Sequence, residues 1–263
     1  MAYDHARKAG NKGDVWKHFM LVTVVDRLAA TDGFRYVDTH SGAPSHELGK
    51  TGEWKGGIGK ALDDCGQVRS HAYMEVASKF IKNRVYPSGW RFVADRLSLR
   101  CPHVEIVLSD TADAVAAKYE ELPLPGIPAN VAVCFSQQDG FRRVESIAKA
   151  DLVLLDPPFN PNAAADWRRL SVACRSLFGR KIPFLAWYPI YSHTNPAKLI
   201  AGTGCPAWQV MWARIGPTPS QNLKGCGMLA SPSLSEILGN AEPDLAELAG
   251  CLGGDFKGRS HGV

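Results

Sequence analysis

A chain of 263 residues is long enough for one large α/β domain or two small ones. A hydrophobic content of 45% and a charged content of 21% are ordinary for a soluble globular protein. The net charge of +4 permits a nucleic-acid partner without requiring one. No apolar run approaches the ~18 residues that a membrane span needs, which excludes an integral membrane protein built from helices.

The seven cysteines are scattered singly along the chain, and none forms a Cys-x-x-Cys pair. This pattern argues against a disulfide framework and against a structural zinc site. It predicts reduced thiols, a cytoplasmic location and no bound metal. The N-terminus carries early charge and lacks an apolar core, so it does not resemble a signal peptide.

The first predicted helix begins at Asp14, a candidate N-cap, and places Phe19 and Val22 on its apolar face. Residues 34–37 then predict a strand. The loop at 38–44 follows it, at the position where a Rossmann-type domain receives its cofactor. Only one glycine remains where dinucleotide-binding folds have three, so a plain turn is the alternative.

Residues 45–85 do not follow a strand–helix alternation, and we expect them to form an inserted helical subdomain. Such an insertion beside the site could contact a large substrate. Residues 1–44 and 86–252 would then form the main domain. The glycine-rich stretch 253–263 is expected to be a flexible tail.

The rest of the chain alternates regularly between strands and helices. Strands are predicted at 34–37, 104–108, 131–135, 152–155, 183–188, 208–215 and 224–230, with helices between the first five and an antiparallel hairpin at the end. This count predicts an α/β protein with a seven-stranded, mostly parallel sheet. The order fits the Rossmann-like fold of class I S-adenosylmethionine-dependent methyltransferases.

The most informative turn follows the strand predicted at 152–155, whose four apolar residues indicate burial on both faces. Asp156 stands at its carboxyl end, and Pro157 and Pro158 stiffen the turn and remove two N–H donors. The Asp156 carboxylate and the Pro157 carbonyl can accept the N–H groups of an exocyclic amine while Phe159 stacks on the base. A strand-end aspartate that caps a turn is the alternative, and these four residues alone do not decide.

Asp-Pro-Pro followed by an aromatic residue is the signature of amino-group methyltransferases. Over most of its length the chain resembles one such family, the J-type (RlmJ) 23S ribosomal RNA adenine-N6 methyltransferases. The stretches that carry the resemblance are Ala9-Gly10-Asn11, Asp14, Lys17-His18, Asp38-Thr39-His40-Ser41-Gly42-Ala43, Thr51-Gly52-Glu53, Tyr86-Pro87, Asp139-Gly140-Phe141, Asp156-Pro157-Pro158-Phe159, Trp187-Tyr188-Pro189 and Gly227-Met228. The N-terminal block and the Asp-Thr-His block together are more specific than the turn.

The resemblance implies an enzyme that transfers a methyl group from S-adenosylmethionine to N6 of one adenine in 23S ribosomal RNA. It implies Asp156 as the catalytic residue, within a turn that also supplies Pro157 and Phe159, and it places Tyr3 and Lys17 on the RNA side. The residues that it assigns to the cofactor are His18, His40, Gly42, Ser88, Gly89, Ser109, Asp110, Asp139, Gly140 and Asp156. A monomer is expected, with no membrane partner.

The chain departs from the family pattern at several of these positions. Pro44 replaces a glycine in the first loop, and Phe159 replaces a tyrosine. The family has a glutamate on the cofactor's ribose, and here either Ser109 or Asp110 takes that role. Ser88 and Gly89 are likewise alternatives for one position after the Tyr-Pro pair.

Two other functions remain open from the sequence. The same turn can grip a DNA adenine or a protein glutamine amide. The degenerate first loop also permits a non-catalytic RNA-binding module that has lost its cofactor. If the substrate is RNA or DNA, the target base must be single-stranded or flipped out of its stack.

Overall fold

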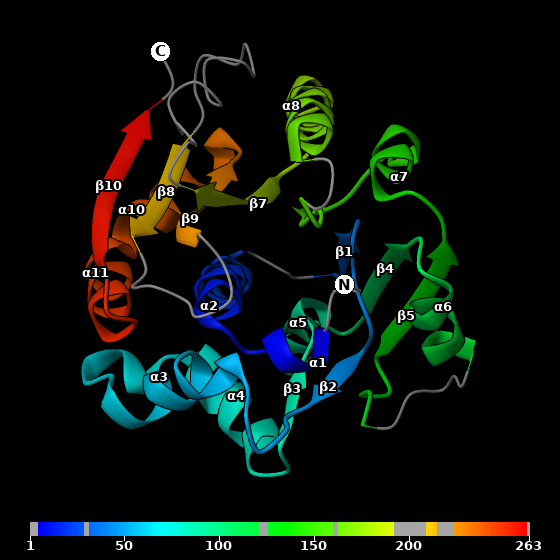
Figure 1. The fold of residues 1–263 in the computed structure, drawn as a ribbon. Helices are drawn as coiled ribbons and strands as arrows, with labels where there is room; N and C mark the ends of the chain where they lie inside the picture. Colours follow the sequence, from blue (N-terminus) through cyan, green and yellow to red (C-terminus); the bar gives the residue numbers. More distant parts are fainter. Residues whose placement is uncertain are drawn as a thin grey trace.

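The computed structural model describes residues 5–28, 32–120, 126–159, 163–191, 209–214 and 223–261. Its central feature is an eight-stranded sheet with helices on both faces (Figure 1). The strand order across the sheet is β10-β8-β9-β7-β6-β1-β4-β5. The strand bounds are β1 Phe34–Asp38, β4 Val104–Asp110, β5 Val131–Gln137, β6 Leu152–Leu155, β7 Phe184–Tyr191, β8 Gln209–Arg214, β9 Leu223–Ala230 and β10 Asp255–His261.

This topology confirms the predicted Rossmann-like class I methyltransferase fold. Strands β5, β4, β1, β6 and β7 are parallel neighbours, as crossover connections through helices require. Strand β9 runs antiparallel between β7 and β8, which confirms the predicted hairpin. All seven predicted strands are present, and β10 is an eighth.

Strand β10 shows that the prediction of a flexible tail at 253–263 was wrong for residues 255–261. This segment pairs antiparallel with β8, and the Phe256 ring lies 6.2 Å from the Trp16 ring. Phe256 is the only large apolar residue in the segment, so its local pattern gives no strand signal. The open edge of β8 supplies the hydrogen-bonding partners instead.

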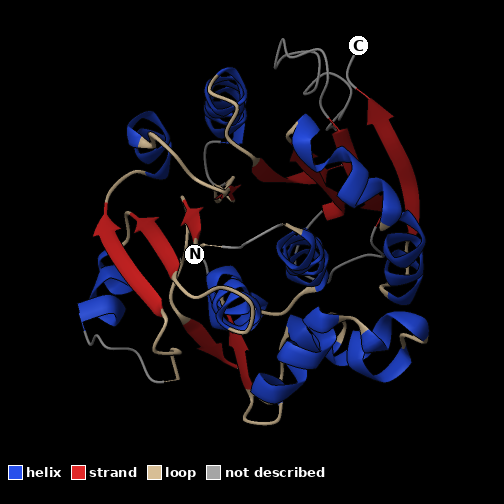
Figure 2. Ribbon diagram, turned by 180° about the vertical axis from the view of Figure 1, so that it is seen from behind, coloured by secondary structure: helices blue, strands red, loops and turns tan. Residues whose placement is uncertain are grey.

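The helices divide between the two faces of the sheet, as Figure 2 shows from behind. Their bounds are α1 His5–Lys8, α2 Lys12–Arg27, α3 Ile58–Asp64, α4 Ala72–Ile81, α5 Gly89–Ser98, α6 Asp113–Glu120, α7 Gly140–Ser146, α8 Ala163–Gly179, α10 Ser235–Asn240 and α11 Glu242–Cys251, with short 3-10 helices η1 Glu53–Lys55, η2 Gln67–Ser70 and η3 Pro232–Leu234. Leu152 and Leu154 pack in the core with α2, α4 and α5. Val153 and Leu155 pack in the core with α7 and α8. Burial on both faces explains the unbroken apolar run of β6.

Helix α2 begins earlier than predicted. The Asn11 side chain caps it by accepting a hydrogen bond from the Asp14 backbone N–H at 3.0 Å. The Asp14 carboxylate instead accepts from the Gly10 N–H at 3.0 Å. Asp14 therefore fixes the chain that enters the helix and is not its N-cap. The helix is buried around most of its circumference because the insertion covers the side away from the sheet.

The insertion starts and ends in a small antiparallel pair of strands, β2 (Ser45–Glu47) and β3 (Val85–Pro87). The helical elements η1, α3, η2 and α4 lie between them. The inner side of α4, including Tyr73 and Val76, is buried in the core that also contains α2 and α11.

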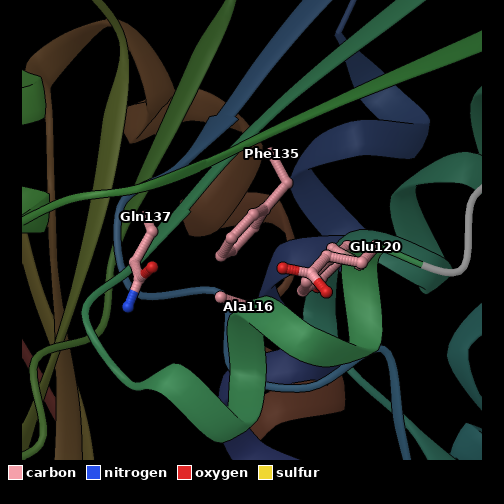
Figure 3. A pocket seen from close by; sticks show the side chains of 5 residues that line it. Ala116, Glu120, Phe135 and Gln137 are labelled. Atoms are coloured by element: carbon pink, nitrogen blue, oxygen red, sulfur yellow. The ribbon is translucent and has the colours of Figure 1, made fainter.

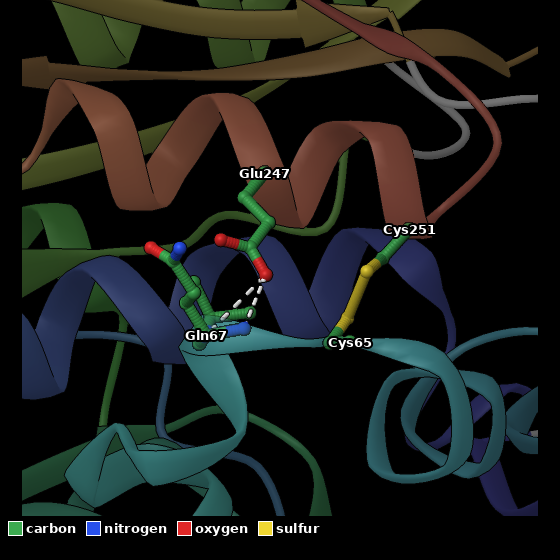
Figure 4. The surroundings of a disulfide bond; sticks show 5 residues. Cys65, Gln67, Glu247 and Cys251 are labelled. Atoms are coloured by element: carbon green, nitrogen blue, oxygen red, sulfur yellow. Dashed lines mark hydrogen bonds between the residues drawn. A yellow bond between two sulfur atoms is a disulfide. The ribbon is translucent and has the colours of Figure 1, made fainter.

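The insertion is joined to the C-terminal helix by a disulfide between Cys65 and Cys251, whose Cα atoms lie 5.6 Å apart (Figure 4). The expectation of uniformly reduced thiols was therefore wrong for this pair. The two cysteines are 186 residues apart in the sequence, so their spacing gave no sign of the bond. Beside them, Glu247 of α11 accepts a hydrogen bond from the Gln67 N–H at 2.6 Å.

Candidate active site

Asp156 stands at the carboxyl end of β6, between β1 and β7, where open α/β sheets bind their ligands. Its Oδ2 accepts a hydrogen bond from Nζ of Lys17 on α2 at 2.5 Å. The same ammonium group lies 3.2 Å from Oδ1 of Asp14. The Lys17 side chain is 11% exposed and that of Asp156 20% exposed, so part of the catalytic candidate remains accessible.

Lys17 and Asp156 each stabilise the charged form of the other. Burial lowers the pKa of Lys17, but the neighbouring carboxylates of Asp156 and Asp14 outweigh burial and the pKa is raised. Burial raises the pKa of Asp156, against the opposing effect of Lys17. The result is a permanent cation beside a carboxylate that is more basic than usual, which suits Asp156 for accepting N–H groups and protons.

Phe159 lies differently from the expectation. Its ring is only 3% exposed and packs against Trp167 at 4.8 Å and Trp187 at 5.9 Å between ring centroids. Its φ of 52° is in the left-handed region, which is costly for an aromatic residue and recurs at functional sites. In this conformation the ring faces its aromatic neighbours, so it does not present the open stacking surface that the sequence suggested.

Asp38 is the last residue of β1 and pairs with Leu154 of β6, two residues before Asp156. Asp38 is 2% exposed and accepts hydrogen bonds from the Tyr36 hydroxyl and the His40 N–H, both at 3.2 Å. Burial, and next the charge of Asp156, raise the pKa of Asp38 to about 7. Asp38 is thus a structural carboxyl group that titrates near neutral pH.

This shift predicts how stability depends on pH. Between about pH 4 and 7 the folded Asp38 holds a proton that the unfolded chain has released, so its contribution to the free energy of unfolding falls as pH rises. A rise of about three units in the pKa of Asp38 corresponds to a loss in the free energy of unfolding on the order of a few kcal/mol. We expect Asp38→Asn to gain stability relative to wild type at pH 8 but not at pH 4, measured by urea unfolding. Parallel pH profiles for the two proteins would contradict this expectation.

The loop after β1 reaches the end of β4 through Gly42, whose N–H donates to Oδ2 of Asp110 at 3.1 Å. Gly42 has a φ of +62°, and a Cβ added there would meet no atom within 4 Å, so open space adjoins the backbone. Ser109 is fully buried, and its hydroxyl accepts from Nε of Arg143 at 3.0 Å. Half-exposed Asp110 is therefore the better placed of the two ribose candidates.

Asp139 and Gly140 stand at the start of α7, where Gly140 packs against Thr39 of the first loop. Asp139 caps α7, and its Oδ1 also accepts from Arg169 at 2.6 Å. The guanidinium group of Arg169 lies 4.3 Å from the centre of the Phe141 ring. Gly140 is required by close approach, because any Cβ there would collide with the Thr39 carbonyl oxygen.

His18 and His40 are both held neutral. Burial lowers the pKa of His40 to about 4, and burial followed by the charge of Lys17 lowers that of His18 well below its usual value. Nδ1 of His18 is 2.9 Å from the hydroxyl of Tyr86 on β3, and that hydroxyl is 3.0 Å from the hydroxyl of Tyr73 on α4. Tyr73 therefore links the insertion to the predicted cofactor pocket.

Removing the hydrogen bond between Tyr86 and His18 gives a testable result. Tyr86→Phe loses one buried hydrogen bond to His18, worth about 1 kcal/mol. We expect the KM for S-adenosylmethionine to rise roughly fivefold with little change in kcat. Tyr73→Phe is the matched control, because it leaves the His18–Tyr86 contact in place. Equal cofactor affinity in wild type and Tyr86→Phe, measured by calorimetry, would rule out this role.

The remaining predicted site residues are Ser88, Gly89 and Tyr3, and the structure describes the first two. Ser88 donates its hydroxyl to the Pro44 carbonyl at 3.1 Å, which ties it to the first loop. Gly89 packs on His18, since a Cβ there would lie 3.3 Å from Nε2. Tyr3 lies outside the described residues. The sequence had assigned no role to Tyr73, and only burial and distance reveal its connection to His18.

A separate pocket of about 250 Å³ lies between α6 and the edge strand β5 (Figure 3). Ala116, Tyr119, Glu120, Phe135 and Gln137 line it. None of these is a predicted site residue. Its connection to the site is indirect, through the Tyr119 hydroxyl, which donates to the Gly42 carbonyl at 3.0 Å.

In the part of the chain that the structure describes, no helix has the length and apolar character needed to cross a bilayer. The described residues also contain no group of three or more His, Cys, Asp or Glu side chains arranged to hold a metal ion.

The chain is similar to several known proteins. Ribosomal RNA large subunit methyltransferase J of Haemophilus influenzae is 27% identical over 222 residues, which cover 77% of this chain and 75% of that protein. The protein of the same name from Escherichia coli is 25% identical over 216 residues, covering 76% and 74%. A crystal structure of a Legionella pneumophila protein superposes with a TM-score of 0.78 at 18% identity, over 97% of this chain and 98% of that one, which shows the shared fold.

A family model described as ribosomal RNA large subunit methyltransferase D, RlmJ, matches residues 31–232. The match covers most of the chain and includes both the first loop and the Asp-Pro-Pro-Phe turn. The chain therefore belongs to the RlmJ family of ribosomal RNA methyltransferases, which use S-adenosylmethionine as the methyl donor.

Proposed function

We propose that this enzyme methylates N6 of an adenine in the 23S ribosomal RNA of the large subunit. The observation that carries the proposal is the Asp156 carboxylate at the carboxyl end of β6, followed by two prolines and paired with a buried lysine. A carboxylate and a carbonyl oxygen from consecutive residues of one turn can accept the two N–H groups of an exocyclic amine. The names of the relatives in Haemophilus influenzae and Escherichia coli support the large-subunit RNA as substrate.

The residues around the first loop fit the methyl donor. The open space at Gly42 admits a ligand against the backbone. Half-exposed Asp110 at the end of β4 would accept hydrogen bonds from the ribose hydroxyls, and Asp139 would accept from the donor's adenine amine. His18 and His40, both neutral, add no positive charge that would repel the sulfonium. S-adenosylmethionine supplies a methyl group on a positively charged sulfur.

The chain's own contribution is to position and polarise the target. One oxygen of Asp156 is held by Lys17, which leaves the other for an N–H of the flipped adenine, and the Pro157 carbonyl accepts the second N–H. These contacts favour a pyramidal nitrogen with an available lone pair. Holding that nitrogen in line with the methyl group contributes most of the acceleration. The departing proton passes to Asp156, whose pKa is already raised by burial.

Stacking by Phe159 requires its ring to leave Trp167 and Trp187. Flipping a base costs a few kcal/mol, and stacking on an aromatic ring recovers about 1–3 kcal/mol. Release of the left-handed backbone at Phe159 would offset part of the cost of moving the ring.

The test is to incubate the purified enzyme and labelled S-adenosylmethionine with unmodified 23S ribosomal RNA, DNA and a protein pool, and then to digest the products. We expect label only in RNA, as N6-methyladenine at one position. Label on another base or another atom would overturn the adenine-N6 proposal. Label confined to DNA or protein would overturn the RNA proposal as well.

A further inference from the structure

Two segments that are far apart in the sequence form a basic surface beside the site. We call it the basic rim and define it by Arg7, Lys8, Lys12, Lys50, Lys55 and Lys60. Residues 7–12 and 50–60 together hold these six basic residues and a single acidic one, Glu53, a net of +5. The whole chain has a net charge of only +4, so the remainder is close to neutral. The positive charge is therefore concentrated here.

The two segments are held together by their backbones. The Ile58 N–H at the start of α3 donates to the Gly10 carbonyl at 2.9 Å. Gly57 packs so closely on Gly10 and Asn11 that an added Cβ would collide with the Gly10 carbonyl oxygen. The first residues of α2 and α3 are therefore fixed side by side, and Figure 1 shows α1 and α2 adjoining the insertion.

Lys12 and Lys60 lie in the first turns of these two helices, which the Ile58–Gly10 hydrogen bond holds side by side. Partial burial and then the charge of Lys60 lower the pKa of Lys12. Within the described residues, none of the ion pairs includes Lys12, Lys50, Lys55 or Lys60. Two neighbouring, half-buried ammonium groups that form no ion pair within the described residues repel each other, and an anion bound between them relieves that repulsion.

The rim lies on the same side of the molecule as Asp156. Helix α2 brings Lys17 to Asp156 at the carboxyl edge of the sheet. Lys12 precedes Lys17 by five residues, about 7.5 Å along a helix axis. Since α2 leads down to the start of β1, its first turn lies at or beyond the carboxyl edge. A polynucleotide whose target base lies at Asp156 therefore has the rim at the same edge of the sheet.

We propose that the basic rim binds the phosphodiester backbone of the RNA strand that carries the target nucleotide, with Lys12 and Lys60 clamping one phosphate. This inference rests on the proposed function, because it takes the target to be presented at Asp156, and it adds where the enzyme holds the flanking RNA. Contacts of this kind set affinity and register, whereas the turn selects the atom that is methylated.

The test compares two double variants of equal charge. Lys12→Gln with Lys60→Gln removes the clamp. The control, Lys149→Gln with Lys181→Gln, removes two exposed lysines that precede β6 and β7 at the opposite edge of the sheet. Binding of an unmodified 23S ribosomal RNA transcript is measured from 50 to 200 mM KCl, together with calorimetric binding of S-adenosylmethionine.

Each lost phosphate contact reduces the slope of log K against log[salt] by about 0.7–0.9. Because the clamp holds one phosphate, we expect the clamp variant to lose about 0.7–0.9 in slope and roughly fivefold in RNA affinity near 0.15 M salt, with cofactor affinity unchanged. The control should match wild type within twofold. Lys12→Arg with Lys60→Arg should restore the slope, which separates loss of charge from loss of fold.

The proposal that the basic rim binds RNA would be overturned by an unchanged slope in the clamp variant, or by an equal loss in the clamp and control variants. A reduced slope that the arginine pair fails to restore would overturn it too. The outcome is independent of the methylated atom. If the wild-type product is not N6-methyladenine while the clamp variant still loses slope, the proposed function fails and the rim stands.

Discussion

Asp156→Asn should reduce methyl transfer by about 10³-fold while leaving the affinity for S-adenosylmethionine within a few-fold of wild type. The asparagine keeps the size of the side chain, and its amide oxygen can still face Lys17. Its amide nitrogen then faces the target amine as a donor, so it cannot accept an N–H or the departing proton. Loss of one such transition-state contact typically costs 10²–10³-fold, and loss of the proton acceptor adds to it.

The measurement is single-turnover transfer to unmodified 23S ribosomal RNA, with calorimetry for the cofactor. Asp14→Asn is the matched control, because Asp14 contacts the same Lys17 ammonium but belongs to α2 and not to the Asp-Pro-Pro-Phe turn. We expect that variant to retain most of its activity. Near wild-type transfer by Asp156→Asn would remove Asp156 from the mechanism.

Lys17→Met should reduce both stability and activity. It deletes the cation between two partly buried carboxylates, and breaking a buried ion pair from one side costs about 3–5 kcal/mol. Lys17 also opposes the effect of burial on the pKa of Asp156, so its removal raises that pKa further. The ionised form of Asp156 then appears only at higher pH. We therefore expect the acid limb of the pH–rate profile to move to higher pH.

Urea unfolding and a pH series of single-turnover rates test these two effects separately. Lys17→Arg keeps the positive charge and should recover most of the stability and the wild-type acid limb. A Lys17→Met enzyme with an unshifted profile would show that the ion pair does not set the protonation of Asp156. In that case the contribution of Lys17 would be structural or directed at RNA alone.

Much of the architecture follows from local pattern. The apolar run at 152–155 and the strands before it predict a parallel sheet, because burial on both faces leaves only apolar residues along a strand. The Asp-Pro-Pro sequence likewise indicates a stiff turn with a carboxylate at the strand end. The structure confirms the fold and the position of that turn, since both depend on residues that are adjacent in the chain.

Contacts between distant segments were decided only by the tertiary structure. β10 forms because β8 offers an open edge, the Cys65–Cys251 bond joins residues 186 apart, and Phe159 is buried because Trp167 and Trp187 surround it. The pairing of Lys17 with Asp156 and the side-by-side placement of the first turns of α2 and α3 likewise depend on contacts between distant segments. The sequence by itself predicted seven of the eight strands of the sheet and the residue types available at their ends. Which charged side chains pair depends on how the helices pack over the whole core. The spacing of apolar residues predicts that one face of a helix is buried, but not which element covers that face.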